Sequence, residues 1–193
     1  TGPIGGNTNY PGSGKSLVVS LSPLTGIPID SNVGGYFGPY LKFSGFDALE
    51  IQGKAEKDVI IYIDGDEGKV QIFEAPFEAV DSHVVGEQIV ELFAKNEEDK
   101  MNISSVSAGT GSDHAWIGCL NFSMWDKRRK GVRFKQAGRG GIGTVFRNKR
   151  IKALVVRFSK LTGVSNNPAD IATVQKVGLK LHKEIIALDD QQC

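Results

Sequence analysis

Two glycine clusters with neighbouring bases are the residues of this sequence best suited to chemistry. Gly34-Gly35 and Gly138-Arg139-Gly140-Gly141 each precede a short segment that is typical of a helix. Backbone N–H groups at a helix start attract anions, and glycine lets a bulky phosphate approach the backbone. Arg139 adds a donor that can bind an oxyanion through two parallel hydrogen bonds. One such motif more often serves close packing of a helix on a sheet, but two with adjacent bases favour a large ligand with two anionic ends.

A third glycine-rich segment, Gly12-Ser13-Gly14-Lys15-Ser16, has the composition of a nucleotide-binding P-loop without its full pattern. The motif needs a glycine five residues before Gly14, where this chain has Asn9. A P-loop also follows a buried strand and opens a helix, whereas the residues after Lys15 are β-prone. We therefore reject a nucleoside triphosphatase.

Side chains that could catalyse acid–base or metal chemistry are few. His83, His114 and His182 show no spacing typical of metal ligands, and no Ser-His-Asp arrangement is readable. Asp113-His114 is the one adjacent acid–base pair, and such a pair in a glycine-rich segment is more often a turn. Cys119 lies in apolar sequence, and we expect it to be a small buried hydrophobic residue. No acid–base residue is assigned within the chain.

The net charge of +1 hides a strong asymmetry along the chain. Residues 47–100 contain 15 acids and 5 bases, whereas residues 126–152 contain 11 bases and one acid. A basic block of this kind indicates phosphates, nucleic acid or an acidic partner surface, or else simply a solvated face. Nucleic acid is disfavoured because few aromatic residues, such as Trp125, Phe134 and Phe146, lie among the bases.

Composition places the chain among globular proteins. It has 193 residues, of which 40% are hydrophobic and 23% charged, and 24 are glycine. No apolar run approaches the ~20 residues of a membrane span, and no signal peptide precedes the first elements. Two cysteines, Cys119 and Cys193, cannot supply the four thiolates of an iron–sulfur cluster, and they favour a reducing, cytoplasmic location. Because the chain begins at Thr1, we expect it to be a fragment of a longer protein.

The elements that must position these residues alternate irregularly between strands and helices. Strands occur in groups with few helices between them, which favours an α+β fold over a doubly wound parallel sheet. Apolar spacing of about 3.6 residues predicts helices, and β-prone runs bounded by turn residues predict strands. The predicted strands are 16–21, 47–52, 58–64, 69–75, 102–107, 115–122 and 151–158, and the predicted helices are 35–45, 82–95, 141–148 and a last one after Asn167-Pro168.

An internal duplication is indicated by the order of elements around the two glycine clusters. Each cluster is followed by a short helix, a lysine and an apolar strand, at nearly equal spacing. The second copy ends near Phe158, and the polar, glycine-containing residues 159–167 read as a linker. We predict one domain over residues 1–158, and in residues 168–193 the first helix of a following helical domain.

The motifs of residues 1–158 resemble, in order, the N-terminal domain of tungsten-containing aldehyde:ferredoxin oxidoreductases. The matching segments are Ser22-Pro23-Leu24-Thr25-Gly26, Asn32-Val33-Gly34-Gly35-Tyr36-Phe37-Gly38, Leu41-Lys42-Phe43-Ser44-Gly45-Phe46-Asp47-Ala48, Gln52-Gly53-Lys54-Ala55-Glu56-Lys57, Ala137-Gly138-Arg139-Gly140-Gly141-Ile142-Gly143 and Lys149-Arg150-Ile151-Lys152-Ala153. The resemblance implies an α+β domain with a duplicated strand–helix–strand unit, which forms the base for a tungsten bis-pyranopterin cofactor.

The resemblance also implies which residues meet that cofactor. Asn32 and the backbone of Gly34 and Gly35 would contact it, and Asn32 and the carbonyl of Gln136 would hold a Mg²⁺ ion between the two pterin phosphates. The remaining contacts would come from the second cluster and two lysines. These residues are Lys15, Lys135, Ala137, Gly138, Arg139, Gly140 and Gly141.

The sequence also departs from the aldehyde oxidoreductase pattern. Lys15 and Lys135 stand where that pattern has arginines, so paired hydrogen bonds to phosphate give way to point charges. Residues 110–116 lack the usual acidic-Asn signature, and Phe146-Arg147-Asn148 replaces a Met-Gly-Ser-like segment. With residues 7–16 and 125–130, these departures resemble the active-site subunits of class II benzoyl-CoA reductases, which reduce the aromatic ring to a cyclic dienoyl-CoA.

We therefore expect the cofactor-binding part of a tungsten, iron–sulfur oxidoreductase that acts on benzoyl-CoA. The alternatives are an aldehyde or carboxylate oxidoreductase of the same family and a non-catalytic phosphate- or nucleic-acid-binding module. The resemblance implies a 4Fe–4S cluster and a metal thiolate held outside these residues. The expected partners are the rest of the same subunit, an iron–sulfur subunit or ferredoxin, a CoA thioester and further copies in an oligomer, without nucleic acid.

Overall fold

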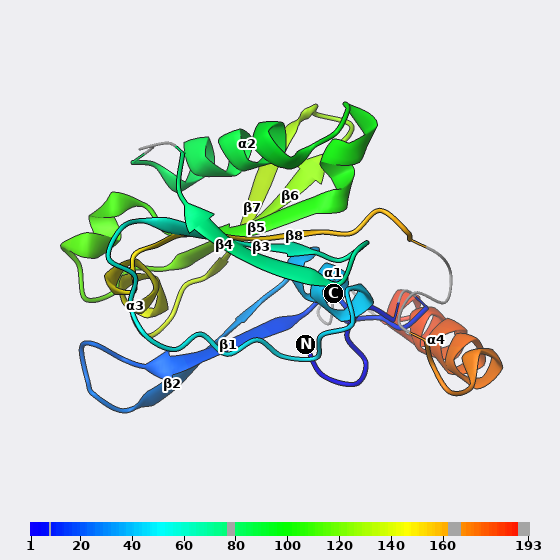
Figure 1. The fold of residues 1–193 in the computed structure, drawn as a ribbon. Helices are drawn as coiled ribbons and strands as arrows, with labels where there is room; N and C mark the ends of the chain where they lie inside the picture. Colours follow the sequence, from blue (N-terminus) through cyan, green and yellow to red (C-terminus); the bar gives the residue numbers. More distant parts are fainter. Residues whose placement is uncertain (8, 77–79, 162–166, 189–193) are drawn as a thin grey trace.

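The computed structural model describes residues 1–193 except 8, 77–79, 162–166 and 189–193 (Figure 1). Strands and helices are mixed, which confirms the predicted α+β class. The strands are β1 (Ser16–Leu21), β2 (Pro28–Val33), β3 (Val59–Asp64), β4 (Lys69–Glu74), β5 (Ile103–Ser107), β6 (Leu120–Asp126), β7 (Gly131–Ala137) and β8 (Ile151–Arg157). The helices are α1 (Phe37–Phe43), α2 (Ser82–Phe93), α3 (Ile142–Asn148) and α4 (Ile171–Ile186), with 3₁₀ turns η1 (Glu98–Asn102) and η2 (Thr110–Asp113).

A six-stranded sheet in the order β4-β3-β8-β5-β6-β7 forms the middle of the molecule. β3 and β8 pair in parallel, and the other neighbours pair antiparallel. Every residue of β8 is buried, and four of the six residues of β3 are. Residues 59–63 of β3 and 153–156 of β8 are apolar or aromatic without polar alternation, because apolar layers cover both faces of these strands.

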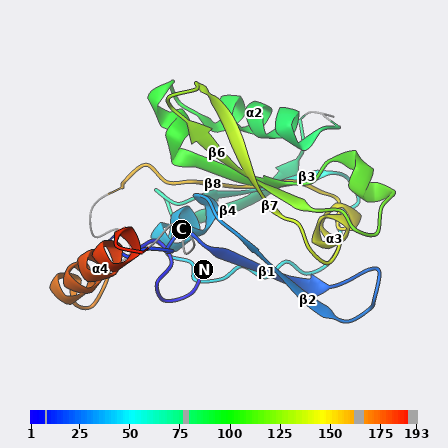
Figure 2. The ribbon, with the colours of Figure 1, turned by 180° about the vertical axis from the view of Figure 1, so that it is seen from behind.

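Two apolar layers lie against this sheet, one on each face (Figures 1 and 2). On one face α2 buries Val85 and Ile89 against residues of β3 and β8. On the other face α1, α3 and the separate two-stranded sheet β1–β2 pack against β5, β6 and β8. The layer that carries both glycine clusters is therefore this second one.

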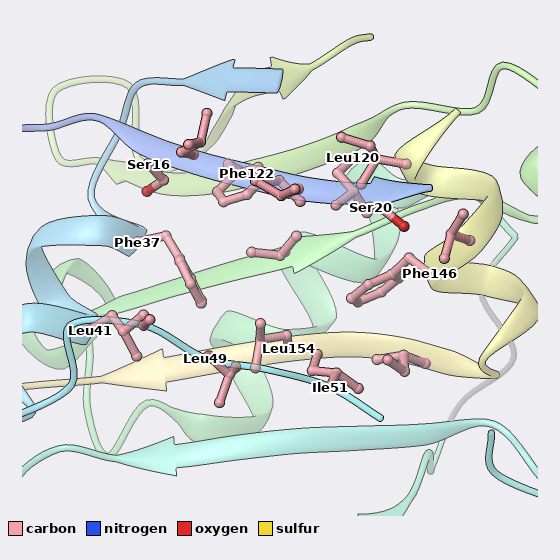
Figure 3. Close-up of a pocket in the computed structure, with 18 of the residues that line it drawn as sticks. Ser16, Ser20, Phe37, Leu41, Leu49, Ile51, Leu120, Phe122, Phe146 and Leu154 are labelled. Atoms are coloured by element: carbon pink, nitrogen blue, oxygen red, sulfur yellow. The ribbon is translucent and has the colours of Figure 1, made fainter. Parts of the chain in front are cut away.

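An apolar cavity of about 380 Å³ separates the β1–β2 hairpin from the six-stranded sheet. Figure 3 shows Phe37, Phe122, Phe146 and Leu154 pointing into it from α1, β6, α3 and β8. Segment 48–51 runs along its rim. Most of its lining residues are apolar, with Thr1, Ser16, Ser20 and Lys149 as the polar exceptions.

The duplicated unit is larger than the sequence indicated. Each copy is an antiparallel hairpin, a glycine cluster, a seven-residue helix and a strand: β1–β2, α1 and β3 in the first, and β6–β7, α3 and β8 in the second. The two last strands pair with each other in parallel at the centre of the sheet. The predicted strand 47–52 is wrong, because Leu49 and Ile51 face the cavity while their backbone joins no ladder. The strand of this copy is β3.

Three further expectations differ from the structure. Strands β2 and β7 were not predicted, because polar and charged residues interrupt their apolar pattern. The predicted strand 115–122 begins only at Leu120, because Thr144 of α3 accepts from the Gly118 N–H and donates to the Ala115 carbonyl. The last helix begins at Ile171 rather than at Asn167-Pro168, because the carboxylate of Asp170 accepts from the Thr173 N–H at 3.0 Å. Part of the predicted linker 159–167, and Cys193, lie outside the described residues.

A buried ion cluster fixes the carboxyl end of β8. The guanidinium of Arg157, whose side chain is 4% exposed, donates to both carboxylate oxygens of Asp99 at 2.8 and 2.9 Å and to Asp66 at 2.7 Å. Asp99 also accepts from the Lys95 N–H and from the Asn102 amide. The cluster ties β8 to η1 and to the β3–β4 turn. None of the helices that the structure describes has the length and apolarity to span a bilayer.

Candidate cofactor-binding site

Both glycine clusters lie at the same point of the two copies, where the second strand of a hairpin turns into a helix. Gly34 follows β2 and Gly138 follows β7. The left-handed φ of +119° at Gly35, and of +73° and +72° at Gly140 and Gly141, allows the sharp change of direction that these turns need.

Gly140 and Gly141 are required by the chain itself. A Cβ atom at Gly140 would lie 2.3 Å from Cγ1 of Ile29, and one at Gly141 would lie 2.2 Å from the Trp116 carbonyl oxygen. Their positive φ values also disfavour any side chain. Close packing therefore accounts for these two glycines, without any need for a bound anion.

Gly34 and Gly138 are different. Neither has a left-handed φ, and a Cβ atom on either would meet nothing within 4 Å among the residues that the structure describes. Neither the backbone conformation nor the packing within the described chain requires glycine at these two matched positions. A ligand that approaches the backbone closely is a physical reason for glycine in such open places.

The structure brings the second cluster against the strand that carries Asn32. The Arg139 N–H donates to Ser31 Oγ at 3.2 Å, and Gly140 lies against Ile29. Asn32 follows Ser31 in β2 and is exposed, so it lies on the outward face of the hairpin. The second cluster thus lies beside β2, but it contacts the inward residues Ile29 and Ser31, whereas Asn32 is on the outward face of the strand.

Three exposed cations lie on segments next to the glycine clusters. Lys15 immediately precedes β1, and the neighbouring Gly14 lies beside the Gly35 carbonyl. Lys135 projects from β7 and Arg139 from the loop that follows it. The N–H of Gly143 in the first turn of α3 is taken by the Gly118 carbonyl at 2.9 Å. Anion binding here would therefore rest on side chains more than on the helix start.

Asn32 and the Gln136 carbonyl can offer neutral oxygen ligands to a metal ion, but no negatively charged ones. The Gln136 amide donates to Asn121 Oδ1 at 3.3 Å, and the Asn121 amide donates to Ser82 Oγ at 2.9 Å. These bonds hold the Gln136 side chain at the end of β7. Amide and carbonyl oxygens suit Mg²⁺ when phosphates supply the negative charge, so the donor set fits the expected ion. Within the described part of the chain no cluster of His, Cys, Asp or Glu could hold a metal alone.

The outward face of β1 is apolar, the reverse of the usual pattern for a surface strand. Leu17, Val19 and Leu21 are 55%, 64% and 61% exposed, while Ser16 and Ser20 face inward. The cross-strand partner of Leu17 is Asn32. A face of this kind in a folded protein is normally covered by a partner or a ligand.

Other predicted residues do not contribute to the site. The Asp113 carboxylate binds the guanidinium of Arg147, whose side chain is 7% exposed, and not His114. Asp58 completes this ion cluster at 3.0 Å, beside a polar hollow of about 350 Å³. Cys119 is half-buried. Sequence reasoning missed Asn121 and Ser31, although a lone Asn in an apolar predicted strand was a signal for the first.

The basic block is split between two places. β6 and β7 form an antiparallel hairpin, so the turn 127–130 lies at one end of it and Arg139 at the other. Seven residues of β7 separate the two ends by roughly 20 Å at about 3.3 Å per residue. The bases of the turn therefore cannot bind the same anion as Arg139.

Comparison with known proteins identifies the domain. A family model described as the aldehyde ferredoxin oxidoreductase N-terminal domain matches residues 1–158. The chain belongs to this family. The tungsten-containing aldehyde ferredoxin oxidoreductase of Pyrococcus furiosus is 34% identical over 190 residues, covering 96% of this chain and 28% of the relative. That of Pyrococcus horikoshii is 35% identical over 195 residues, covering 97% and 28%.

A solved structure is also similar to this chain. The active-site complex BamBC of benzoyl coenzyme A reductase, solved with 1,5-dienoyl-CoA, matches with a TM-score of 0.62 and 27% identity. The match covers 80% of this chain and 21% of that one. The chain thus spans 28% of the length of the two tungsten-containing aldehyde ferredoxin oxidoreductases and 21% of the matched benzoyl coenzyme A reductase chain.

Proposed function

We propose that this chain is the cofactor base of a tungsten bis-pyranopterin oxidoreductase. The observation that carries the proposal is the pair Gly34 and Gly138, which occupy matched positions in the two copies and are not required by their own chain. A duplicated domain that leaves two equivalent open glycines suits a ligand made of two similar halves. Family membership makes two pterins the halves concerned.

The roles of the surrounding residues follow from their chemistry. Lys15, Lys135 and Arg139 would neutralise the pterin phosphates, with Arg139 able to give paired hydrogen bonds. Asn32 and the Gln136 carbonyl would hold Mg²⁺ between those phosphates. When bound, the cofactor would supply the low-potential electron transfer, and the protein would orient it and tune its electrostatics.

The preferred substrate is benzoyl-CoA, reduced to a cyclic dienoyl-CoA. The likeness to the benzoyl-CoA reductase complex and the lysines at positions 15 and 135 support it. An aldehyde or carboxylate substrate is the second candidate, supported by the 34% identity to the Pyrococcus furiosus enzyme over nearly the whole chain. A 4Fe–4S cluster outside these residues and an electron-carrying partner, a ferredoxin or iron–sulfur subunit, belong to either proposal.

The apolar outer face of β1 supports a further part of the proposal. Leu17 is the cross-strand partner of Asn32, and Val19 and Leu21 continue the same outward face of the hairpin away from the cavity. The rest of the same subunit would cover this face and enclose the cofactor against it. A cytoplasmic enzyme that forms oligomers completes the proposal.

Three alanine substitutions test the open glycines in the full-length protein prepared without oxygen. Gly34→Ala and Gly138→Ala should leave Tm unchanged but lower tungsten and pterin content at least severalfold, because the new methyl group occupies the space of the ligand. Gly111→Ala is the matched control, since Gly111 is also open and has no left-handed φ. Full tungsten content in the first two variants, or no tungsten in the parent protein, would refute the proposal.

A further inference from the structure

The turn between β6 and β7 gathers three arginines around a small hollow. Arg128, Arg129 and Arg133 line about 250 Å³ together with Asp126. This place is the opposite end of the hairpin from the proposed cofactor site. The function proposed above therefore leaves these arginines without a role.

Asp126 organises the turn. Its carboxylate accepts from the backbone N–H groups of Arg128 and Arg129 at 3.0 and 3.2 Å. The same group pairs loosely with the guanidinium groups of Arg129 and Arg133, at 3.7 and 3.6 Å. One carboxylate thus fixes the backbone of the turn and orients two of the arginines while balancing only one of their charges.

The positive charge of the turn is largely unpaired. Arg129 and Arg133 keep 66% and 54% of their side chains exposed. Lys127, Arg128 and Lys130 make no ion pair with any residue in the described ranges. Three guanidinium groups and one carboxylate leave a net charge of about +2 around the hollow, which suits a dianion. Planar guanidinium groups match the oxygens of phosphate with paired hydrogen bonds.

Nucleic acid suits the turn poorly because the nearby aromatic rings are already engaged. The Lys100 ammonium lies 5.0 Å from the ring centre of Trp125, and Phe134 packs under α2 against His83 and Gly86. Single-stranded nucleic acid needs such rings free for base stacking. A hollow rather than a flat patch also favours a small anion over a protein surface.

We propose that the β6–β7 turn is a phosphate-binding site in which Arg128, Arg129 and Arg133 take a terminal phosphate monoester. Arg133 and Lys135 alternate on one face of β7, and Arg139 follows in the next loop. A row of cations thus leads from the proposed cofactor site to the hollow, which suits an elongated ligand with a distal phosphate. The 3′-phosphate of coenzyme A has this chemistry, and choosing it as the ligand rests on the proposed function, whereas the site itself does not.

Calorimetric titration of the full-length protein with CoA, 3′-dephospho-CoA and inorganic phosphate tests the site. We expect CoA to bind about tenfold more tightly than dephospho-CoA, as one set of charge-assisted bonds provides. The triple variant Arg128→Gln, Arg129→Gln, Arg133→Gln should lose this preference, and Arg133→Lys should keep only part of it. Lys176→Gln, Lys180→Gln, Lys183→Gln removes the same charge from the exposed face of α4 and should bind both compounds as the parent does.

The possible outcomes distinguish CoA from free phosphate as the ligand. They also distinguish failure of the phosphate site from failure of the cofactor proposal. Arginine-dependent binding of inorganic phosphate with equal affinity for CoA and dephospho-CoA would support the site but assign it a free phosphate. Unchanged binding of CoA and phosphate in the triple arginine variant would overturn the proposed phosphate site. A variant that lost binding only to an oligonucleotide or to an acidic electron carrier would overturn it as well. Normal tungsten content without arginine-dependent phosphate binding refutes this site alone, whereas arginine-dependent binding in a protein without tungsten refutes only the cofactor proposal.

Discussion

Replacing Asp99 by Asn should open the carboxyl end of β8. The Asp99 side chain is 6% exposed and accepts four hydrogen bonds: two from Arg157, one from the Lys95 N–H and one from Asn102. The substitution keeps the shape but removes the charge, and it turns one acceptor into a donor that faces the guanidinium. Arg157 would remain buried with Asp66 as its partner.

The size of the effect follows from two independent considerations. Burial alone would raise the pKa of Asp99, but hydrogen bonds from Arg157, Asn102 and Lys95 lower it to about 2. A fall of this pKa from the ordinary value of 3.8 is worth about 2 kcal/mol at roughly 1.4 kcal/mol per unit. Breaking a buried ion pair costs about 3–5 kcal/mol. We therefore expect Asp99→Asn to reduce the local stability by about 2–5 kcal/mol.

Hydrogen exchange of the β8 and η1 amides in the full-length protein measures this local stability. Glu98→Gln is the matched control, because Glu98 is the exposed neighbour in the same 3₁₀ turn and its change should stay within about 0.5 kcal/mol. A loss of protection below about 1 kcal/mol in Asp99→Asn would contradict the reasoning, since it is less than neutralisation alone should cost.

The same group predicts a pH dependence. Because the folded pKa is lower than the unfolded one, the stabilisation is complete above pH 4 and disappears as the pH falls towards 2. Protection of β8, corrected for intrinsic exchange, should fall over this interval in the parent protein. Asp99→Asn should lack that fall, and an equal fall in both proteins would assign it to other carboxylates.

Two further substitutions test packing and charge elsewhere in the domain. Arg147→Met leaves the carboxylates around it without their buried cation and should lower stability by about 3–5 kcal/mol, whereas Arg150→Met at an exposed position should change Tm little. Gly140→Ala should destabilise by about 1–3 kcal/mol more than Gly68→Ala, because both have left-handed φ but only the former would meet Ile29. Equal Tm values within either pair would refute the corresponding contact.

The elements that sequence predicted well are those whose burial is uniform. The middle of β8, residues 153–156, is apolar because both faces of the strand are covered, and α2 has a helical apolar stripe over one face of the sheet. β2 and β7 were not predicted because outward-facing residues in each strand are polar, such as Asn32 in β2 and Lys135 in β7. The false strand at 47–52 shows that apolar side chains can line a cavity without their backbone joining a sheet.

The candidate site could be predicted in part for a similar reason. The sequence indicates where glycine and cations cluster, but it does not indicate what surrounds each glycine. Gly138 and Gly140 are two residues apart, yet one lies in open space and the other against Ile29. Only the packing of Ser31 on Arg139, 108 residues along the chain, and of the neighbouring Ile29 on Gly140 distinguishes a glycine left open from one that the fold requires.

The order of strands in the sheet has a consequence for how the chain folds as it is synthesised. β8, the last strand, lies between β3 and β5, so its two neighbours have no shared partner until residues 151–157 have emerged. Until then the β3–β4 hairpin and the β5–β6–β7 meander are separate pieces, each with an unpaired edge. Such edges promote aggregation, and pairing across such long separations is slow. The nascent domain is therefore most vulnerable just before its final strand is made.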